Sequence, residues 1–443
     1  MSAPASPTAN APAPPTSRGP SRAARGWALA LLALGAAGAG IPSPLYPGYQ
    51  AQLGFGDLTL TAVYAVYPLV SVPAVFLLGA LGDRLSPRRV MRRGIVVAAA
   101  GSVALALAPS TGWLVASRVA YGVALAVITG AGVAVATSGA DKVRAGTVSA
   151  LVFLLGTGAG PVLGGALTGY GPTPGLLPFG VDVVLLGVVF VGLGRVRDPD
   201  PRPSPAAGSR DGAMTRAARR ALVVAAVNGF LGWAVVGLFL GLISSVAERF
   251  LGLRDPLVAG GLAGALLVWS TVTVPAVGRL GPRRAQLVGL VALAVSLVVL
   301  ALGVGSLAAV VTACVVAGLA NGMLYGAATT TVSTTAPPER ASRTAAAVYS
   351  AFYLGAGLPA LLVGLLTVVL PLDAALSTIA VATFVPTVVM IILTARTATR
   401  APSAEGAGRR GRDGAATHRD LAGPLEAVAD PPGAGRVHPR RGR

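Results

Sequence analysis

Twelve long apolar runs constrain this chain more than any other feature of its sequence. A helix needs about 20 mostly apolar residues to cross a bilayer. The runs cover residues 27–45, 58–81, 94–108, 112–136, 148–170, 176–193, 221–246, 257–277, 285–304, 307–332, 344–370 and 372–395. Because they are continuously apolar rather than alternating, they predict membrane helices and not the strands of a barrel. The expected fold class is an all-α membrane protein with twelve transmembrane helices.

The composition favours lipid as the solvent for most of the chain. Hydrophobic residues make up 54% and charged residues 12%, whereas a soluble domain carries about 25% charged residues. A net charge of +19 could indicate nucleic-acid binding. Here, however, the basic residues lie in tails and short loops between apolar runs, so no nucleic-acid partner is expected.

The basic residues also predict how the chain is oriented. If the N-terminus is cytoplasmic, 32 of the 35 Lys and Arg residues lie on the cytoplasmic side. The opposite loops carry two, Arg249 and Arg254, and Arg118 lies inside a run. By the positive-inside rule, this asymmetry predicts a multi-pass protein of the cytoplasmic membrane with both termini in the cytoplasm.

The sequence repeats itself at an interval of 195 to 202 residues. Segment 72–75 recurs at 274–277, 84–89 recurs as 279–284, and 149–150 matches 350–351. Two six-helix halves follow, with a substrate site expected between them near the membrane midplane. The expected parts are a disordered tail at 1–25, a first half at 26–194, a cytoplasmic linker at 195–220, a second half at 221–395 and a disordered basic tail at 396–443.

Few residues suit metal or cofactor chemistry. Cys314 is the single cysteine, and both histidines, His418 and His438, lie in the C-terminal tail. No disulfide, zinc site or haem is expected, and an intramembrane enzyme would lack the convergent groups it needs. The chain also lacks a Gly-rich loop ending in Gly-Lys-Ser/Thr, so a proton gradient is a better candidate energy source than ATP.

Three motifs point to one family. The segment after the second run reads Gly79-Ala80-Leu81-Gly82-Asp83-Arg84-Leu85-Ser86-Pro87-Arg88-Arg89. The fourth run contains Arg118-Val119-Ala120-Tyr121-Gly122-Val123-Ala124, and the fifth contains Gly156-Thr157-Gly158-Ala159-Gly160-Pro161-Val162-Leu163-Gly164-Gly165. The first two resemble the loop and helix-4 motifs of the major facilitator superfamily. The third is similar to the signature of its drug–proton antiporter branch, and the resemblance covers about residues 25–398.

The sequence also departs from these motifs. Ser86 stands where the loop motif has its second glycine, and Tyr121 stands where a glutamine is common. The second-half copy of the loop lacks the acidic residue. The first run lacks the acidic residue that some drug–proton antiporters use, which leaves the identity of the proton carrier open.

The motif residues imply gating roles. Gly79 removes a side chain where two helix ends approach. The resemblance suggests that Asp83 contacts the start of helix 11 and holds the cytoplasmic side shut. Arg84 and Arg88 either take part in that gate or serve only as topology signals.

The helix-5 motif implies a second gating element. A proline such as Pro161 bends a helix, and small residues such as Gly160, Gly164 and Gly165 allow close helix packing. The resemblance assigns this region to the interface between the halves, where it limits leakage. A purely structural kink is the alternative.

Charged residues inside the runs are candidates for substrate binding or proton coupling. Arg118 is costly in lipid, so it is expected to face a cavity or a partner, where it could bind an anionic substrate group or influence a proton site. An arginine that extends to the interface is the alternative. Asp182 is expected near the outer interface, at the start of the sixth helix.

Uncharged polar residues are further candidates. Asn228, Asn321 and Tyr325 lie on helices that line the cavity in the family, and Tyr64 and Tyr67 share one face of the second helix. Each could contact the substrate or serve only in helix packing.

The function expected from the sequence is secondary active transport. The chain would export a small, lipophilic molecule in exchange for protons by alternating access, and a monomer is expected to suffice. A facilitator or proton symporter that imports a small metabolite is the alternative within transport. A membrane enzyme or receptor is the disfavoured alternative outside it.

Overall fold

The computed structural model describes residues 20–82, 86–138, 142–173, 175–196, 214–336 and 341–396, and every regular element in those ranges is helical. The first elements are α1 (Arg22–Gly40), the 3-10 turn η1 (Ser43–Leu45), α2 (Tyr46–Leu53), α3 (Asp57–Gly82), α4 (Pro87–Ala106), α5 (Thr111–Ala136), α6 (Lys142–Tyr170) and α7 (Leu177–Gly194). They are followed by α8 (Arg216–Leu251), α9 (Pro256–Thr273), α10 (Ala276–Leu280), α11 (Pro282–Gly303), α12 (Leu307–Thr335), α13 (Ala341–Leu366) and α14 (Leu372–Arg396).

Eleven helical segments in these ranges are long and apolar enough to cross a membrane. α4 is the twelfth long helix, with 20 residues. Its first two turns carry Arg88, Arg89, Arg92 and Arg93, so only its second part is apolar, which is why the sequence showed a short run there. It packs along α5 and α7 like a membrane helix. The prediction of an all-α, twelve-helix membrane fold is therefore confirmed.

Prolines interrupt two of the predicted runs. The first run ends as a helix at Gly40, and Pro42, Pro44 and Pro47 then accompany the change into η1 and α2. The eighth run divides at Pro275 into α9 and α10. A proline has no N–H to donate within a helix and its ring clashes with the preceding turn, so an apolar run alone overestimates the length of each helix.

α8 extends further than its apolar run because its ends are capped. The Thr215 side chain accepts a hydrogen bond from the Ala218 N–H, which satisfies one of the free donors at the helix start. Gly252 ends the helix with φ 66°, a left-handed conformation that suits glycine. Residues 231–247 of α8 are all buried, so helices surround α8 on every side over that stretch.

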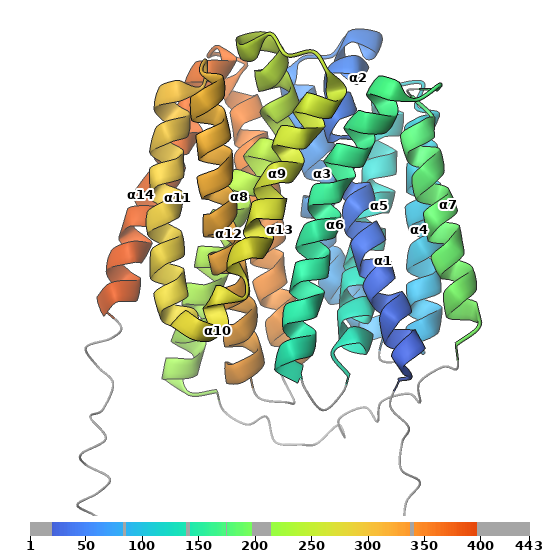
Figure 1. Cartoon of the computed structure of the whole chain (residues 1–443), viewed down its shortest axis with the longest axis vertical. Helices are drawn as coiled ribbons and strands as arrows, with labels where there is room; N and C mark the ends of the chain where they lie inside the picture. The colour runs from blue at the N-terminus through green and yellow to red at the C-terminus, as the bar shows by residue number, and fades with distance from the viewer. Residues whose placement is uncertain are drawn as a thin grey trace, which may run out of the picture. The chain divides into compact units, whose positions relative to one another are not determined.

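The helices form two six-helix halves that meet along two helix pairs. In the first half, α1 packs on α5, α6 and α7, and α4 packs on α5 and α7; in the second half, α8 packs on α12 and α13, and α11 packs on α12 (Figure 1). α3 packs on α13 and α6 packs on α9, and these two pairs join the halves. The described residues through Ala395 form one compact unit.

The two ends of the bundle differ in charge. α2 lies at the upper end in Figure 1, which we call the α2 end. α4, α8 and α11 begin at the opposite end, and their first turns carry arginines. We call this the arginine-rich end.

Candidate functional site

Two charged side chains are buried inside the first half. Within the described ranges, Arg118 and Asp182 are the only Lys, Arg, Asp or Glu side chains in the buried class, with 0% and 2% exposure. A buried charge is expensive unless a hydrogen-bond or charge partner compensates it. The surroundings of these two residues therefore define the first part of the site.

Arg118 lies on α5 and reaches the end of α1. Its Nη1 and Nη2 atoms both donate to the carbonyl oxygen of Ala39, each at 3.2 Å. The guanidinium carbon lies 4.3 Å from the centre of the Tyr67 ring, a cation–π contact. Because α1 ends at Gly40, the Ala39 carbonyl is one of the last in the helix, where a cation is favourable. Arg118 thus points into the bundle and not to its surface.

Asp182 lies on the second turn of α7 and faces α4 and α1. Ser102 Oγ of α4 donates to Asp182 Oδ2 at 2.6 Å. The sequence placed this residue near the outer interface, a depth in the membrane that stays a prediction. Its carboxyl group is enclosed by neighbouring helices, and the residue is 2% exposed. A periodicity argument could not show this, because α7 is apolar on most of its faces.

Gly38 of α1 makes room for this carboxyl group and for Tyr121. A Cβ atom at Gly38 would lie 1.6 Å from Tyr121 Oη and 2.9 Å from Asp182 Oδ2. Tyr121 is fully buried, and its hydroxyl has no hydrogen-bond partner. The hydroxyl and the carboxyl group therefore converge on one point of the α1 backbone.

We call Tyr67, Ser102, Arg118, Tyr121 and Asp182 the first-half polar cluster. They surround the backbone of Gly38 and Ala39. Ion pairs in the described residues link Asp57 to Arg249 and Glu248 to Arg254, and none links Arg118 to Asp182. The buried cation and the buried acid therefore contact adjacent residues of α1, Ala39 and Gly38, without forming an ion pair. Sequence reasoning named Arg118, Asp182 and Tyr67 but missed Ser102 and Gly38.

Aromatic side chains from both halves meet in a second cluster. It contains Phe153 of α6, Trp233 of α8, Tyr325 of α12, and Tyr349 and Phe352 of α13. The ring centres of contacting pairs lie 5.4 to 6.4 Å apart. Trp233 is 6% exposed, and its Nε1 donor has no hydrogen-bond partner. We call this group the aromatic cluster; the sequence pointed to Tyr325 alone among its members.

The remaining polar candidates contact neighbouring helices. Asn228 Nδ2 donates to Gln286 Oε1 at 3.0 Å, and Asn321 Nδ2 donates to Ser270 Oγ at 3.2 Å. Both bonds lie within the second half, and the Oδ1 atom of each asparagine has no partner. In each amide the Nδ2 donor therefore bonds to a neighbouring helix, whereas the Oδ1 acceptor forms no hydrogen bond.

Tyr64 and Tyr67 lie on one face of α3, as their spacing predicted. Their rings are edge to face at 5.6 Å, and Tyr64 also contacts Tyr46 at 6.4 Å. Tyr64 faces Gly241 of α8, where a Cβ atom would lie 2.9 Å from its ring. This tyrosine therefore lies where the first half meets α8.

Polar contacts close the α2 end between the halves. Asp57 of α3 and Arg249 of α8 form a two-pronged ion pair at 2.6 and 2.7 Å. Ser43 Oγ donates to the Leu240 carbonyl oxygen at 2.5 Å, and Ser244 Oγ donates to the Ser43 carbonyl oxygen at 2.9 Å. These bonds hold the end of the first-half bundle against α8.

The glycines of α6 serve two different interfaces. A Cβ atom at Gly160 or Gly164 would lie 2.1 or 2.2 Å from a carbonyl oxygen of α1 or of Ile41 just after it. A Cβ atom at Gly165 would lie 2.2 Å from the carbonyl oxygen of Pro256, which begins α9 in the other half. Pro161 also faces α9, because a Cβ atom at Gly260 would lie 2.1 Å from its carbonyl oxygen.

The sequence model of the Major Facilitator Superfamily matches residues 28–360 of this chain. The chain belongs to the major facilitator superfamily. The resemblance inferred from the three motifs is thereby confirmed, and this is a family of transporters.

Several relatives of this facilitator have names that describe export or resistance. The multidrug efflux protein YfmO of Bacillus subtilis (strain 168) is 26% identical over 354 residues, which cover 77% of this chain and 86% of that protein. The tetracycline resistance protein, class C, of Escherichia coli is 29% identical over 294 residues, which cover 62% and 72%. These relatives are consistent with the drug–proton antiporter branch.

Solved structures share the facilitator fold. A POT family transporter in complex with a thioalcohol-conjugated peptide gives a TM-score of 0.69 at 12% identity, covering 85% of this chain and 96% of that one. A bacterial homologue of the human lysosomal transporter Spinster, in an inward-facing and unoccupied conformation, gives a TM-score of 0.60 at 16% identity, with the same coverage. At such identities the likeness concerns the fold alone.

Part of the facilitator loop motif lies outside the described residues. Asp83 and Arg84 fall there, and Gly79 lies in the α3 backbone near its end. Arg88 is described: its Nη1 donates to the Val196 carbonyl oxygen at 2.8 Å, which joins the start of α4 to the chain just after α7 within one half. The gating role of these residues stays a prediction.

Proposed function

We propose that this facilitator exports a small, lipophilic molecule in exchange for protons, with both chain termini in the cytoplasm. The observation that carries the proposal is the aromatic cluster. Its rings come from both halves, so movement of one half against the other changes the cluster directly. A substrate bound there would contact both halves, while the space between the halves opens to one side of the membrane at a time.

The chemistry of the aromatic cluster favours a lipophilic substrate. Its five side chains carry no charge, and aromatic rings offer large apolar faces. The unpartnered Trp233 Nε1 can donate one hydrogen bond to a polar atom of the substrate. The relatives named for multidrug efflux and tetracycline resistance support the same substrate class.

Asp182 is the proposed proton carrier. A buried carboxylate is costly without compensation, and Ser102 supplies the hydrogen bond that is seen. Arg118 contacts the next residue of α1, because its guanidinium donates to the Ala39 carbonyl oxygen while Asp182 lies beside Gly38. A shift of α1 would change both contacts, which links proton release to movement of the first half.

The α2 end is the proposed outer end. This assignment follows the positive-inside rule, because the arginines gather at the opposite end. The ion pair between Asp57 and Arg249, together with the Ser43 contacts, then closes the protein toward the outside. Transport requires these contacts to break when the substrate site opens outward.

Proton and substrate fluxes in proteoliposomes test the proposal. The purified protein is reconstituted into liposomes that contain a pH-sensitive dye. Tetracycline and a panel of uncharged aromatic compounds are then added. Substrate addition should move protons in the opposite direction, and a pH gradient should drive substrate uptake. Asp182→Asn should abolish proton movement, whereas the matched control Asp373→Asn, at the start of α14, should leave it intact. Flux that is indifferent to pH gradient and membrane potential would show a facilitator, and parallel movement would show a symporter.

A further inference from the structure

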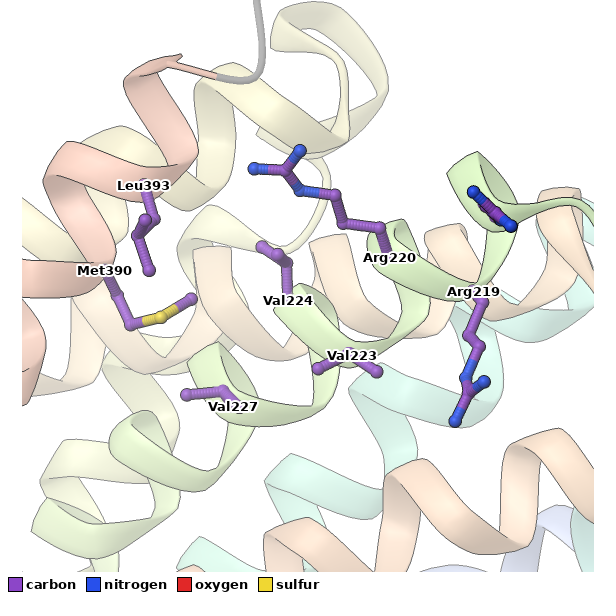
Figure 2. Close-up of a pocket in the computed structure, with 8 residues that line it drawn as sticks. Arg219, Arg220, Val223, Val224, Val227, Met390 and Leu393 are labelled. Carbon is purple, nitrogen blue, oxygen red and sulfur yellow. The ribbon is translucent and has the colours of Figure 1, made fainter.

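A groove lies between α8 and α14 at the arginine-rich end of the second half. Its volume is about 520 Å³, and eight residues line it (Figure 2). Five are apolar: Val223, Val224, Val227, Met390 and Leu393. The other three are Arg216, Arg219 and Arg220, on the first turns of α8.

The groove is amphipathic along the axis of α8. Val223 is 55% exposed, Val227 is 37% exposed and Leu393 is 40% exposed, whereas Met390 is 7% exposed and forms part of the floor. Figure 2 shows Arg220 extending over the groove, with Val224 and Val227 on the side that faces Met390. None of the eight lining residues is acidic. The groove thus presents cations at the end of the bundle and an apolar channel further into the membrane.

In the first half, a side chain fills the position that corresponds to this groove. The repeat makes α1 the counterpart of α8, and α7 the counterpart of α14. The Trp27 indole of α1 lies against Gly192 of α7, where a Cβ atom would be 2.4 Å from the ring. α8 has valines in this region and leaves the groove open. The opening is therefore a property of this pair of helices and not of the fold as such.

We propose that this groove binds an anionic phospholipid of the surrounding leaflet. The phosphate lies against Arg220, which extends over the groove (Figure 2), because guanidinium groups form strong, paired hydrogen bonds with phosphate oxygens. One acyl chain lies along Val223, Val227 and Leu393. Basic pockets between membrane helices suit such headgroups, and the apolar walls face the acyl region, which a soluble phosphate would not require.

Photo-crosslinking in nanodiscs tests this proposal on the full-length protein. The nanodiscs consist of phosphatidylcholine with a trace of phosphatidylglycerol that carries a diazirine on one acyl chain. Mass spectrometry should map the labels to 223–227 and 390–393, at a level about fivefold or more above that of a matched phosphatidylcholine probe, since each cation near the surface adds to the attraction. Equal labelling by the two probes would overturn the proposal.

Two sets of variants separate the groove from general surface charge. Replacing Arg216, Arg219 and Arg220 with glutamine should lower phosphatidylglycerol labelling about tenfold. The control replaces Arg279, Arg284 and Arg343, three exposed arginines outside the groove, and should leave labelling unchanged. An equal loss in the control would mean that net charge alone attracts the lipid, and the proposal would fail.

A third variant and a competitor test the acyl-chain part of the site. Val227→Phe narrows the groove and keeps all three arginines, so it should reduce labelling at 223–227 without affecting expression. Soluble glycerol phosphate at millimolar concentration should leave labelling intact. If it displaces the probe, or if Val227→Phe has no effect, the headgroup alone is recognised and the proposed lipid site is wrong.

Discussion

Adding one methyl group at Gly165 should disturb the contact between the two halves. The new Cβ atom would lie 2.2 Å from the Pro256 carbonyl oxygen, whereas ordinary contact begins at 3.4 Å, so α6 and α9 must separate by about 1 Å. A carbonyl oxygen at the start of a helix cannot rotate away as the tip of a flexible side chain would. The strain therefore falls on the conformation in which these helix ends touch.

The expected size of the effect follows from the cost of overpacking. Inserting a methyl group into a packed interface costs about 1–3 kcal/mol. At about 1.4 kcal/mol for each factor of ten, the closed α2 end should become about 5- to 150-fold less populated relative to conformations in which it is open. The methyl group in Gly165→Ala adds no charge, so this change in population is purely steric.

Distance measurements between spin labels at the α2 end provide the assay. Cysteines at Ala51 and Arg254, in a Cys314→Ser background, place one label on each half at exposed positions. Gly165→Ala should broaden the distance distribution toward longer values and slow substrate transport. The matched control is Gly146→Ala on the same helix, where nothing lies within 4 Å of a new Cβ atom. If Gly165→Ala and Gly146→Ala give the same distances and transport rates at equal membrane expression, the contact does not control the conformation.

Four further outcomes are expected. Arg118→Ala should reach the membrane but lose transport, and Arg118→Lys should keep partial activity because it retains the charge but not the planar fork of donors; wild-type transport by the alanine variant would exclude a role in turnover. Asp182→Asn should still exchange substrate while proton flux disappears, so coupled protons in this variant would identify another carrier. Asp57→Asn removes an ion pair whose arginine is 45% exposed, so the open conformation, measured by the spin-label distance from Arg254 to a cysteine at Ala51, should rise in population by fivefold or less, since exposed pairs contribute about 1 kcal/mol or less; high salt should reproduce the rise in the unsubstituted protein. That cysteine should react with an impermeant reagent from outside intact cells, whereas one at Gly208 should not, and the reverse pattern would invert the proposed topology.

The helix count and fold class could be predicted from sequence because lipid imposes a simple requirement on each segment. A run long enough and apolar enough must be a helix, and this is independent of what packs beside it. The boundaries were less predictable where local chemistry intervenes. The Thr215 cap lengthens α8 beyond its apolar run, and Pro275 divides another run, and neither effect changes the hydropathy of the segment.

The candidate site was only partly predictable, because its contacts join helices that are distant in sequence. A buried arginine attracts notice by itself, but its acceptor, the Ala39 carbonyl oxygen, belongs to the backbone and leaves no trace in residue identity. Ser102 is an ordinary small polar residue until it is seen beside Asp182. Phe153 and Trp233 read as core residues on two unrelated runs, and only the folded arrangement of the helices brings their rings within 6.0 Å of each other.

The glycines that allow α6 to pack closely on α1 tolerate substitution much less than the rings of the aromatic cluster do. Side chains at Gly160 and Gly164 would collide with backbone atoms, which no rotamer change can avoid, so selection for new substrates has almost no freedom there. The rings of the aromatic cluster contact one another, and a change of ring size at Phe153 meets neighbouring rings that can repack. A population under selection by a new toxic compound should therefore acquire its first substitutions in those rings, while Gly160 and Gly164 stay unchanged in every surviving lineage.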